Sequence, residues 1–136
     1  MKKYLPPIAS VMLVLLMGCA SQPSDRDMNS LASALTKVSA AVDASARYKR
    51  STDTLDEKQL LQVSTAHDAS LMKPFEGMTV RVLRVGRDSA VLVCQASSGR
   101  ALLEDAGCTA RLDASRWNTG PNPCEFTLDV KLICAR

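Results

Sequence analysis

The chain has 136 residues, of which 46% are hydrophobic and 23% are charged, a balance typical of a folded globular protein. This length fits one small domain, which excludes a two-domain enzyme, and the composition excludes a disordered chain. The formal net charge is +3, and Lys2 and Lys3 account for two of these charges. The remainder is nearly neutral and lacks the positive surface of a nucleic-acid-binding protein.

The first 18 residues have the pattern of an export signal. Lys2 and Lys3 precede an apolar run from Leu5 to Met17, with the sequence LPPIASVMLVLLM. A helix needs about 20 apolar residues to cross a bilayer. The run is therefore too short to remain as a membrane span, and we expect residues 1–18 to be removed as a signal peptide.

The end of this run is Leu16-Met17-Gly18-Cys19, which resembles the lipobox of bacterial lipoproteins: an apolar, a variable and a small residue before a cysteine. Met17 departs mildly from the Ala or Ser that is commoner at the variable place. The resemblance implies that the Cys19 thiol is lipidated and anchors the protein to a membrane. Ala20 follows where Asp would imply the inner membrane, so the implied location is the outer membrane, facing the periplasm. Residues 19–27 would be the lipidated cysteine and a flexible tether.

Four cysteines remain after Cys19, and all of them lie in the C-terminal third of the chain: Cys94, Cys108, Cys124 and Cys134. An even number in an exported chain indicates two disulfides, each stabilising a small domain by about 2 to 4 kcal/mol. No two cysteines have C-x-x-C spacing, and His67 is the only histidine. We therefore predict no metal site.

Residues 28–67 are predicted to be a helical region. Apolar residues recur there at intervals of three and four, which places them on one stripe of a helix from about residue 27 to 49: Met28, Leu31, Leu35, Val38 and Val42. Asp25 or Asp27 would lie near its N-cap. The stripe spans only about two heptads, fewer than a coiled coil needs.

A shorter second helix is predicted after a polar break. Thr54 and Glu57 have the spacing of a capping box. The segment from Gln62 to Thr65 could alternatively form a strand, because it contains two β-branched residues.

Residues 70–136 are predicted to form an antiparallel β domain of about four strands, which makes the fold class α+β. Residues 78–85 and 89–95 alternate and are separated by Gly86-Arg87-Asp88, a pattern typical of a hairpin. A short helical turn is expected over Ala101 to Asp105, ended by Gly107. A third strand is expected over residues 108–113.

The last part of the chain is predicted to be a loop and a long strand. Residues 117–123 contain one glycine and two prolines in four positions, which favours a loop. In residues 124–134, apolar residues from Cys124 to Cys134 occupy every second position, and Glu125, Thr127, Asp129 and Lys131 lie between them, which predicts the fourth strand.

The predicted strands constrain the disulfides. Cys124 and Cys134 would stand roughly 33 Å apart in one strand, whereas bridged Cα atoms lie about 5.5 Å apart. If residues 108–113 pair antiparallel with 124–134, Cys108 lies beside Cys134 and can form a disulfide with it. Cys94 then forms the second disulfide with Cys124. The rival pairing, Cys94 with Cys134 and Cys108 with Cys124, needs a different strand order and stays open.

No catalytic arrangement is predicted. His67 lies beside Asp68, but neighbouring residues rarely face each other, and the chain has no G-x-S-x-G motif. Glu104 and Asp105 would point apart by about 100° on a helical turn and remain solvated. We predict neither an enzyme nor a cofactor or small-molecule substrate.

Two function classes follow. The first is an accessory or assembly lipoprotein of an envelope machine of the secretion, pilus or conjugation type, which resembles pilotin-type lipoproteins in size and anchoring only. Its envelope partner would contact the helix stripe through Leu31, Leu35 and Val38, and the loop through Trp117. The alternative is a small binding, inhibitory or stress-sensing module displayed at the outer membrane.

Overall fold

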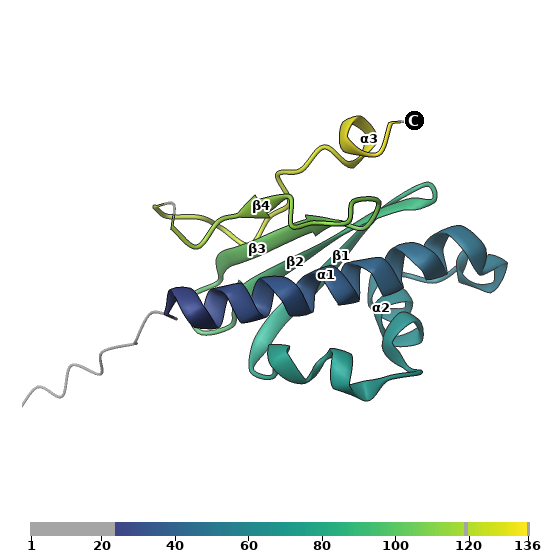
Figure 1. Ribbon diagram of the computed structural model, residues 1–136. Helices are drawn as coiled ribbons and strands as arrows, with labels where there is room; N and C mark the ends of the chain where they lie inside the picture. The colour runs from purple at the N-terminus through teal and green to yellow at the C-terminus, as the bar shows by residue number, and fades with distance from the viewer. Residues whose placement is uncertain (1–23, 119, 136) are drawn as a thin grey trace, which may run out of the picture.

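The computed structural model describes residues 24–118 and 120–135, and it shows an α+β fold built around one antiparallel sheet (Figure 1). The sheet has the order β1-β2-β3-β4, with β1 at Met78–Val85, β2 at Asp88–Gln95, β3 at Arg100–Ala106 and β4 at Ala114–Ser115. The predicted signal peptide and Cys19 lie outside the described residues.

The predicted hairpin is confirmed. β1 and β2 pair antiparallel from Met78 opposite Gln95 to Val85 opposite Asp88. Two residues, Gly86 and Arg87, form the turn, and Gly86 has φ +64. Glycine is favoured at this first turn position because a positive φ there matches the twist of the flanking strands.

Two helices cover one face of the sheet. α1 (Asp25–Tyr48) packs on β2 and β3, and α2 (Glu57–Thr65) packs on β1. The N-cap of α1 is Ser24, one residue before the first predicted candidate, and it forms a capping box with Asp27. The short 3₁₀ helix η1 (Arg50–Thr52) lies between α1 and α2, and two more, η2 (Ala69–Leu71) and η3 (Lys73–Phe75), lie between α2 and β1.

The second helix is confirmed, but its start is not the predicted one. Asp56 caps α2 and forms a capping box with Gln59. An Asp side chain accepts hydrogen bonds from the first turn of a helix as well as Thr does. The helix therefore starts at the capping box of Asp56 and Gln59 rather than at that of Thr54 and Glu57. The segment from Gln62 to Thr65 belongs to this helix, and the alternative of a strand there is wrong.

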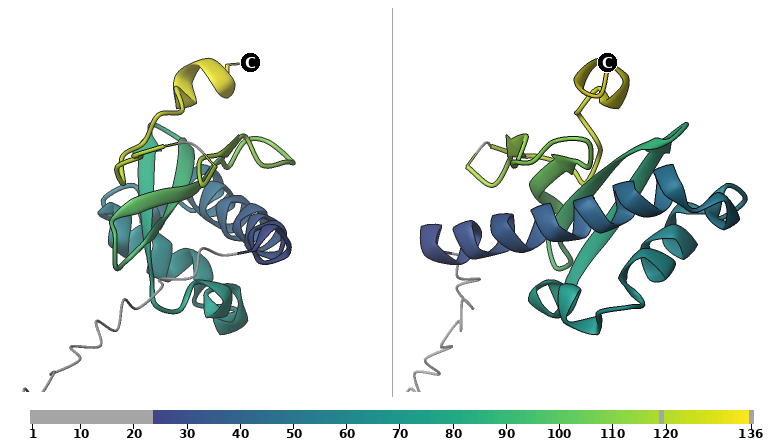
Figure 2. Two further views of the ribbon diagram at one scale, coloured as in Figure 1. Left: turned by 90° about the vertical axis from the view of Figure 1, so that its left-hand side faces the viewer. Right: turned by 45° about the vertical axis from the view of Figure 1, so that its right-hand side comes forward.

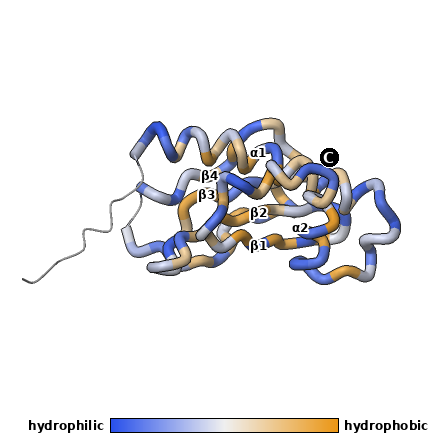
Figure 3. Tube along the Cα trace, turned by 90° about the horizontal axis from the view of Figure 1, so that it is seen from below, coloured by the Kyte–Doolittle hydropathy of each residue, from blue (hydrophilic) through white to orange (hydrophobic). Residues whose placement is uncertain are grey.

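The apolar stripe of α1 belongs to the core of the chain itself. Leu35 and Val38 are 0% exposed and Leu31 is 7% exposed. They pack with strand residues that include Val91, Val93 and Leu103. Figure 3 shows the hydrophobic colour concentrated along the strands and the facing side of the helices. In this fold Leu31, Leu35 and Val38 are therefore not available to a partner, which corrects the role predicted for them.

Strand β3 and the turn that follows it replace two predicted elements. Residues 101–105, predicted to be a helical turn, lie within β3, and residues 108–113, predicted to be a strand, form the turn that follows it. Ala, Leu and Glu favour helices in isolation. Pairing with β2 overrides that preference, because β3 is buried on both faces and its burial decides the outcome.

The C-terminal segment is not the predicted strand. We call residues 124–134 the C-terminal strap. Its first part is extended without a strand partner, and it ends in the short helix α3 (Val130–Ile133). The predicted alternation is still present in the burial, since Phe126 and Leu128 pack against the sheet whereas Glu125 and Thr127 are exposed. The pattern identified the faces of an extended segment, but it did not identify its partner.

The two disulfides fix the strap at both ends. Cys94 of β2 is bonded to Cys124, with the Cα atoms 5.7 Å apart, and Cys108 is bonded to Cys134, with the Cα atoms 5.8 Å apart. These pairs match the connectivity that the strand argument favours, although the geometry differs. The strap crosses the face of the sheet opposite α1 and α2, so the fold has three layers (Figure 2).

The buried carboxylate of Glu104 holds the middle of the strap. Glu104, on β3, is 0% exposed, which contradicts the prediction that it is solvated. Its Oε1 accepts hydrogen bonds from the backbone N–H groups of Thr127 at 2.8 Å and Leu128 at 2.9 Å, and its Oε2 accepts one from the Thr127 hydroxyl at 2.8 Å. Arg116 lies 3.4 Å from Oε2 and also donates to the Glu125 carbonyl. The Glu104 carboxylate thus accepts the hydrogen bonds from the strap's backbone N–H groups that the carbonyls of a neighbouring strand would otherwise accept.

We predict that Glu104→Gln destabilises the protein by about 3 kcal/mol or more, because Arg116 would keep a buried charge without its anionic partner. Urea unfolding of the oxidised protein measures the free energy. The matched control is Glu125→Gln, an exposed carboxylate on the same strap, which should change the free energy of unfolding by less than about 0.5 kcal/mol. Equal effects of the two substitutions would contradict this role of Glu104.

Candidate functional site

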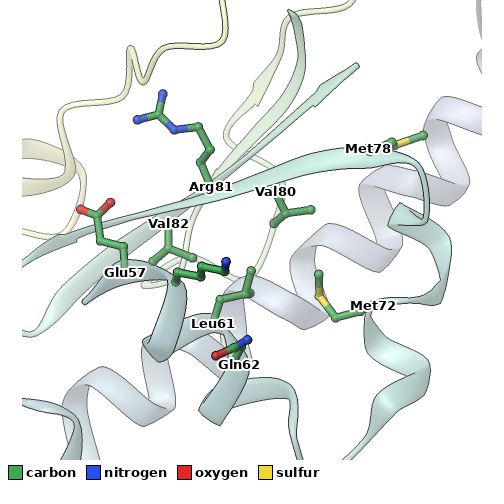
Figure 4. Close-up of a pocket in the computed structure, with 9 residues that line it drawn as sticks. Glu57, Leu61, Gln62, Met72, Met78, Val80, Arg81 and Val82 are labelled. Carbon is green, nitrogen blue, oxygen red and sulfur yellow. The ribbon is translucent and has the colours of Figure 1, made fainter. Parts of the chain in front are cut away.

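A groove of about 430 Å³ lies between α2 and β1 (Figure 4). Its walls are largely apolar and come from three parts of the chain, with the side chains of Leu61, Met72, Met78, Val80 and Val82. Polar and charged side chains complete the lining: Glu57, Lys58, Gln62 and Arg81. An apolar recess with a charged rim on the surface is typical of a binding site.

The groove exists because α2 and β1 do not close completely on each other. Val82 forms its most buried part at 3% exposure, whereas Met72, Met78 and Val80 are only half-buried. Two of these side chains are methionines, which are unbranched and adapt to ligands of different shape. The surface can therefore accept an apolar group without rearrangement of the core beneath it.

The charges near the groove are divided between two faces of the sheet. In Figure 4 the Arg81 side chain points away from Leu61 and Val80. Its guanidinium donates to the Cys124 carbonyl at 2.7 Å and lies 5.6 Å from the centre of the Phe126 ring, so it is bound to the strap. Lys58, in the first turn of α2, is exposed at the groove itself.

A second polar cluster lies between α1 and β3. Asp105 is 1% exposed, again contrary to the predicted solvation. The Ser39 hydroxyl and the Asp113 backbone N–H donate to its two carboxylate oxygens. Burial raises the pKa of Asp105 from its ordinary value of 3.8 to about 6, and the neighbouring Asp113 carboxylate also raises it, against the lowering effect of the Ser39 hydrogen bond.

This cluster supports packing rather than chemistry. Gly107 approaches α1 so closely that an added Cβ would lie 2.5 Å from Asp43 Cβ. Asp105 itself is 1% exposed between α1 and β3, so a substrate does not reach its carboxylate. We therefore treat Asp105 as a titrating group of the core.

Trp117, the remaining predicted contact residue, and His67, for which no catalytic role is predicted, both lie away from the groove. Trp117 is half-buried against the hydrophobic core, and its backbone N–H donates to the Leu102 carbonyl at 3.1 Å. His67 is exposed just after α2, while the carboxylate of Asp68 accepts from the backbone and the hydroxyl of Ser70. The structure therefore brings neither His67 nor Trp117 to the groove.

Over residues 24–118 and 120–135, no group of three His, Cys, Asp or Glu side chains is placed to hold a metal ion. No helix in that same part of the chain is long and apolar enough to cross a membrane. Comparisons of the chain with models of protein families, with curated proteins and with solved structures gave no match.

We predict that the free energy of unfolding of the wild-type protein falls, relative to that of Asp105→Asn, as the pH rises from about 4 to about 7. The folded state binds the Asp105 proton up to about pH 6, whereas the unfolded chain releases it near its ordinary pKa of 3.8. The stabilisation present below pH 4 is thus lost as the pH passes through 6, by about 1 to 3 kcal/mol.

Urea unfolding at several pH values measures this difference. Glu76→Gln, which removes an exposed carboxylate between η3 and β1, serves as the control for loss of one negative charge. If the free-energy gap between wild type and Asp105→Asn stays constant from pH 4 to 7, the raised pKa is wrong.

Proposed function

We propose that the protein is a lipid-anchored accessory protein of the bacterial cell envelope, held in the outer membrane through Cys19, facing the periplasm and binding an envelope protein partner. The observation that carries the proposal is the C-terminal strap with its two disulfides. A whole layer of the fold is fixed by Cys94–Cys124 and Cys108–Cys134. Such bonds form and persist in oxidising compartments, of which the periplasm is one.

The start of the folded part suits a tether. Residues 24–27 are exposed, and α1 begins at Asp25 with its own capping box. The helix therefore needs no residue before Ser24 for its N-terminal hydrogen bonds. The lipobox that Leu16-Met17-Gly18-Cys19 resembles would place the lipid only a few residues upstream.

The groove between α2 and β1 supports the binding role. Leu31, Leu35 and Val38 are buried in the core, so the groove replaces them as the apolar surface that would contact the partner. It also adjoins β1, the edge of the sheet, and exposed sheet edges are common places of protein association. These features together support partner binding, which an accessory or assembly role requires.

We predict that Cys19→Ala abolishes incorporation of labelled palmitate and releases the protein from the membrane fraction, because the acyl chains supply the membrane affinity. Ala20→Asp is the matched control. It should keep the label but move the protein to the inner membrane, as the resemblance to enteric-type lipoproteins implies.

Palmitate labelling and separation of the two membranes on a density gradient give both readouts. Continued labelling and sedimentation of the Cys19→Ala protein would overturn the anchor. Crosslinking in intact cells, followed by purification from membranes, tests the accessory role, for which we expect subunits of one envelope machine. Recovery of a single enzyme instead would favour the inhibitory alternative.

A further inference from the structure

We propose that β1 binds an extended segment of the partner protein, which adds to the sheet as a further strand and places alternate apolar side chains in the groove, with an acidic residue facing Lys58. This inference rests on the proposed partner-binding function and names the chemistry of the partner. Four features of the edge strand and the groove support it.

The first feature is the free backbone edge. β1 is an edge strand of eight residues, all of them paired with β2 on one side. Val85 and Asp88 close the two-residue turn as a hydrogen-bonded pair, so Leu83, Arg81 and Thr79 also bond to β2. The N–H and C=O groups of Val80 and Val82 then point to the open edge, where a further strand would meet them.

The second feature is the position of the groove relative to that edge. Val80 and Val82 have their side chains on the face of the sheet that α2 covers, and both line the groove. A strand added beside β1 would continue this face, because side chains of paired strands alternate together. Every second side chain of the added segment would therefore enter the groove and contact Leu61 and Met72, which calls for an apolar residue there (Figure 4).

The third feature is the charge at the groove. Lys58 forms no ion pair within the described part of the chain. It lies in the first turn of α2 beside the exposed carboxylates of Asp56 and Glu57, where the helix dipole adds a partial positive charge. Arg81 adds a further positive charge on the opposite face of the same edge. Lys58 is therefore the positive group at the groove with which an acidic residue of the bound segment would pair.

The fourth feature disfavours the register in which two copies of β1 would pair about Arg81. An antiparallel pair of β1 strands that sets Val80 opposite Val82 also sets Arg81 opposite Arg81. Like charges directly opposite each other destabilise a strand pair. This register of self-pairing is therefore disfavoured, whereas a partner segment with an acidic residue facing Lys58 meets no like charge.

The experiment uses the mature protein, immobilised in detergent, and a phage-displayed library of random octapeptides as the probe. We expect the selected peptides to share apolar residues at alternate positions and at least one acidic residue. Peptides synthesised from the selected sequences are then titrated against wild type and variants. Val80→Pro should weaken binding by about tenfold or more, because proline removes the outward N–H while edge strands tolerate it.

Two further variants make the result decisive. Val80→Ala keeps the backbone N–H and should weaken binding less than Val80→Pro. Lys58→Glu changes an exposed side chain that the fold does not need, and it should weaken binding of acidic peptides while a peptide with Lys in place of the acid regains affinity. This charge reversal tests the site even if Val80→Pro fails to fold.

Selected peptides without alternation, no enrichment over an empty support, or equal affinity for wild type, Val80→Pro and Lys58→Glu would each overturn the inference. A wild-type dimer in sedimentation that Val80→Pro dissociates would assign the edge to a second copy and also overturn it. These outcomes are independent of palmitate labelling, so the anchor and the edge site can fail separately.

Discussion

The carboxylate of Glu104 is the interaction on which the arrangement of the outer layer depends. An ionised side chain with no exposure is costly to bury unless every oxygen is satisfied. Here two backbone N–H groups, one hydroxyl and Arg116 satisfy it, and all but Arg116 come from the C-terminal strap. The sheet can accept Glu104 on its outer face only when the strap is in place. The disulfides keep it there by holding both ends, while the carboxylate determines the position of the middle.

The need for that layer follows from β2 and β3. Both strands are buried on both faces, and apolar residues such as Leu92 and Ala101 would be exposed without the strap. α1 covers one face with its apolar stripe, so the other face requires a second cover. The chain supplies it with a short extended segment whose half-buried side chains add little hydrophobic area. Covalent bonds replace the packing that a helix would give, which suits a chain with few aromatic residues.

The elements with a local signal could be predicted from the sequence. The stripe from Met28 to Val42 and the hairpin around Gly86 depend on neighbouring residues, and both form as expected. The errors arise where tertiary context decides. Residues 101–105 have helical propensity but lie beside β2, and residues 124–134 alternate because one face is buried, which an unpaired strap satisfies as well as a strand. Alternation reports burial, not hydrogen bonding. The groove escaped prediction because α2, Met72 and β1 contribute to it from separate parts of the chain.

The strap also affects the edge strand β1, because the Arg81 side chain of β1 is bound to it. A charged side chain in the middle of an edge strand usually protects it from association, since an incoming strand would bury the charge. In this protein the guanidinium is held by the Cys124 carbonyl and the Phe126 ring, both on the strap. Arg81 is thereby drawn toward the outer layer and away from the groove face. Arg81, which would otherwise protect β1 from an added strand, instead binds the strap. The backbone edge of β1 therefore stays accessible beside the apolar groove. The Cys94–Cys124 bond, by fixing the strap where Arg81 binds, thus helps to keep that edge open.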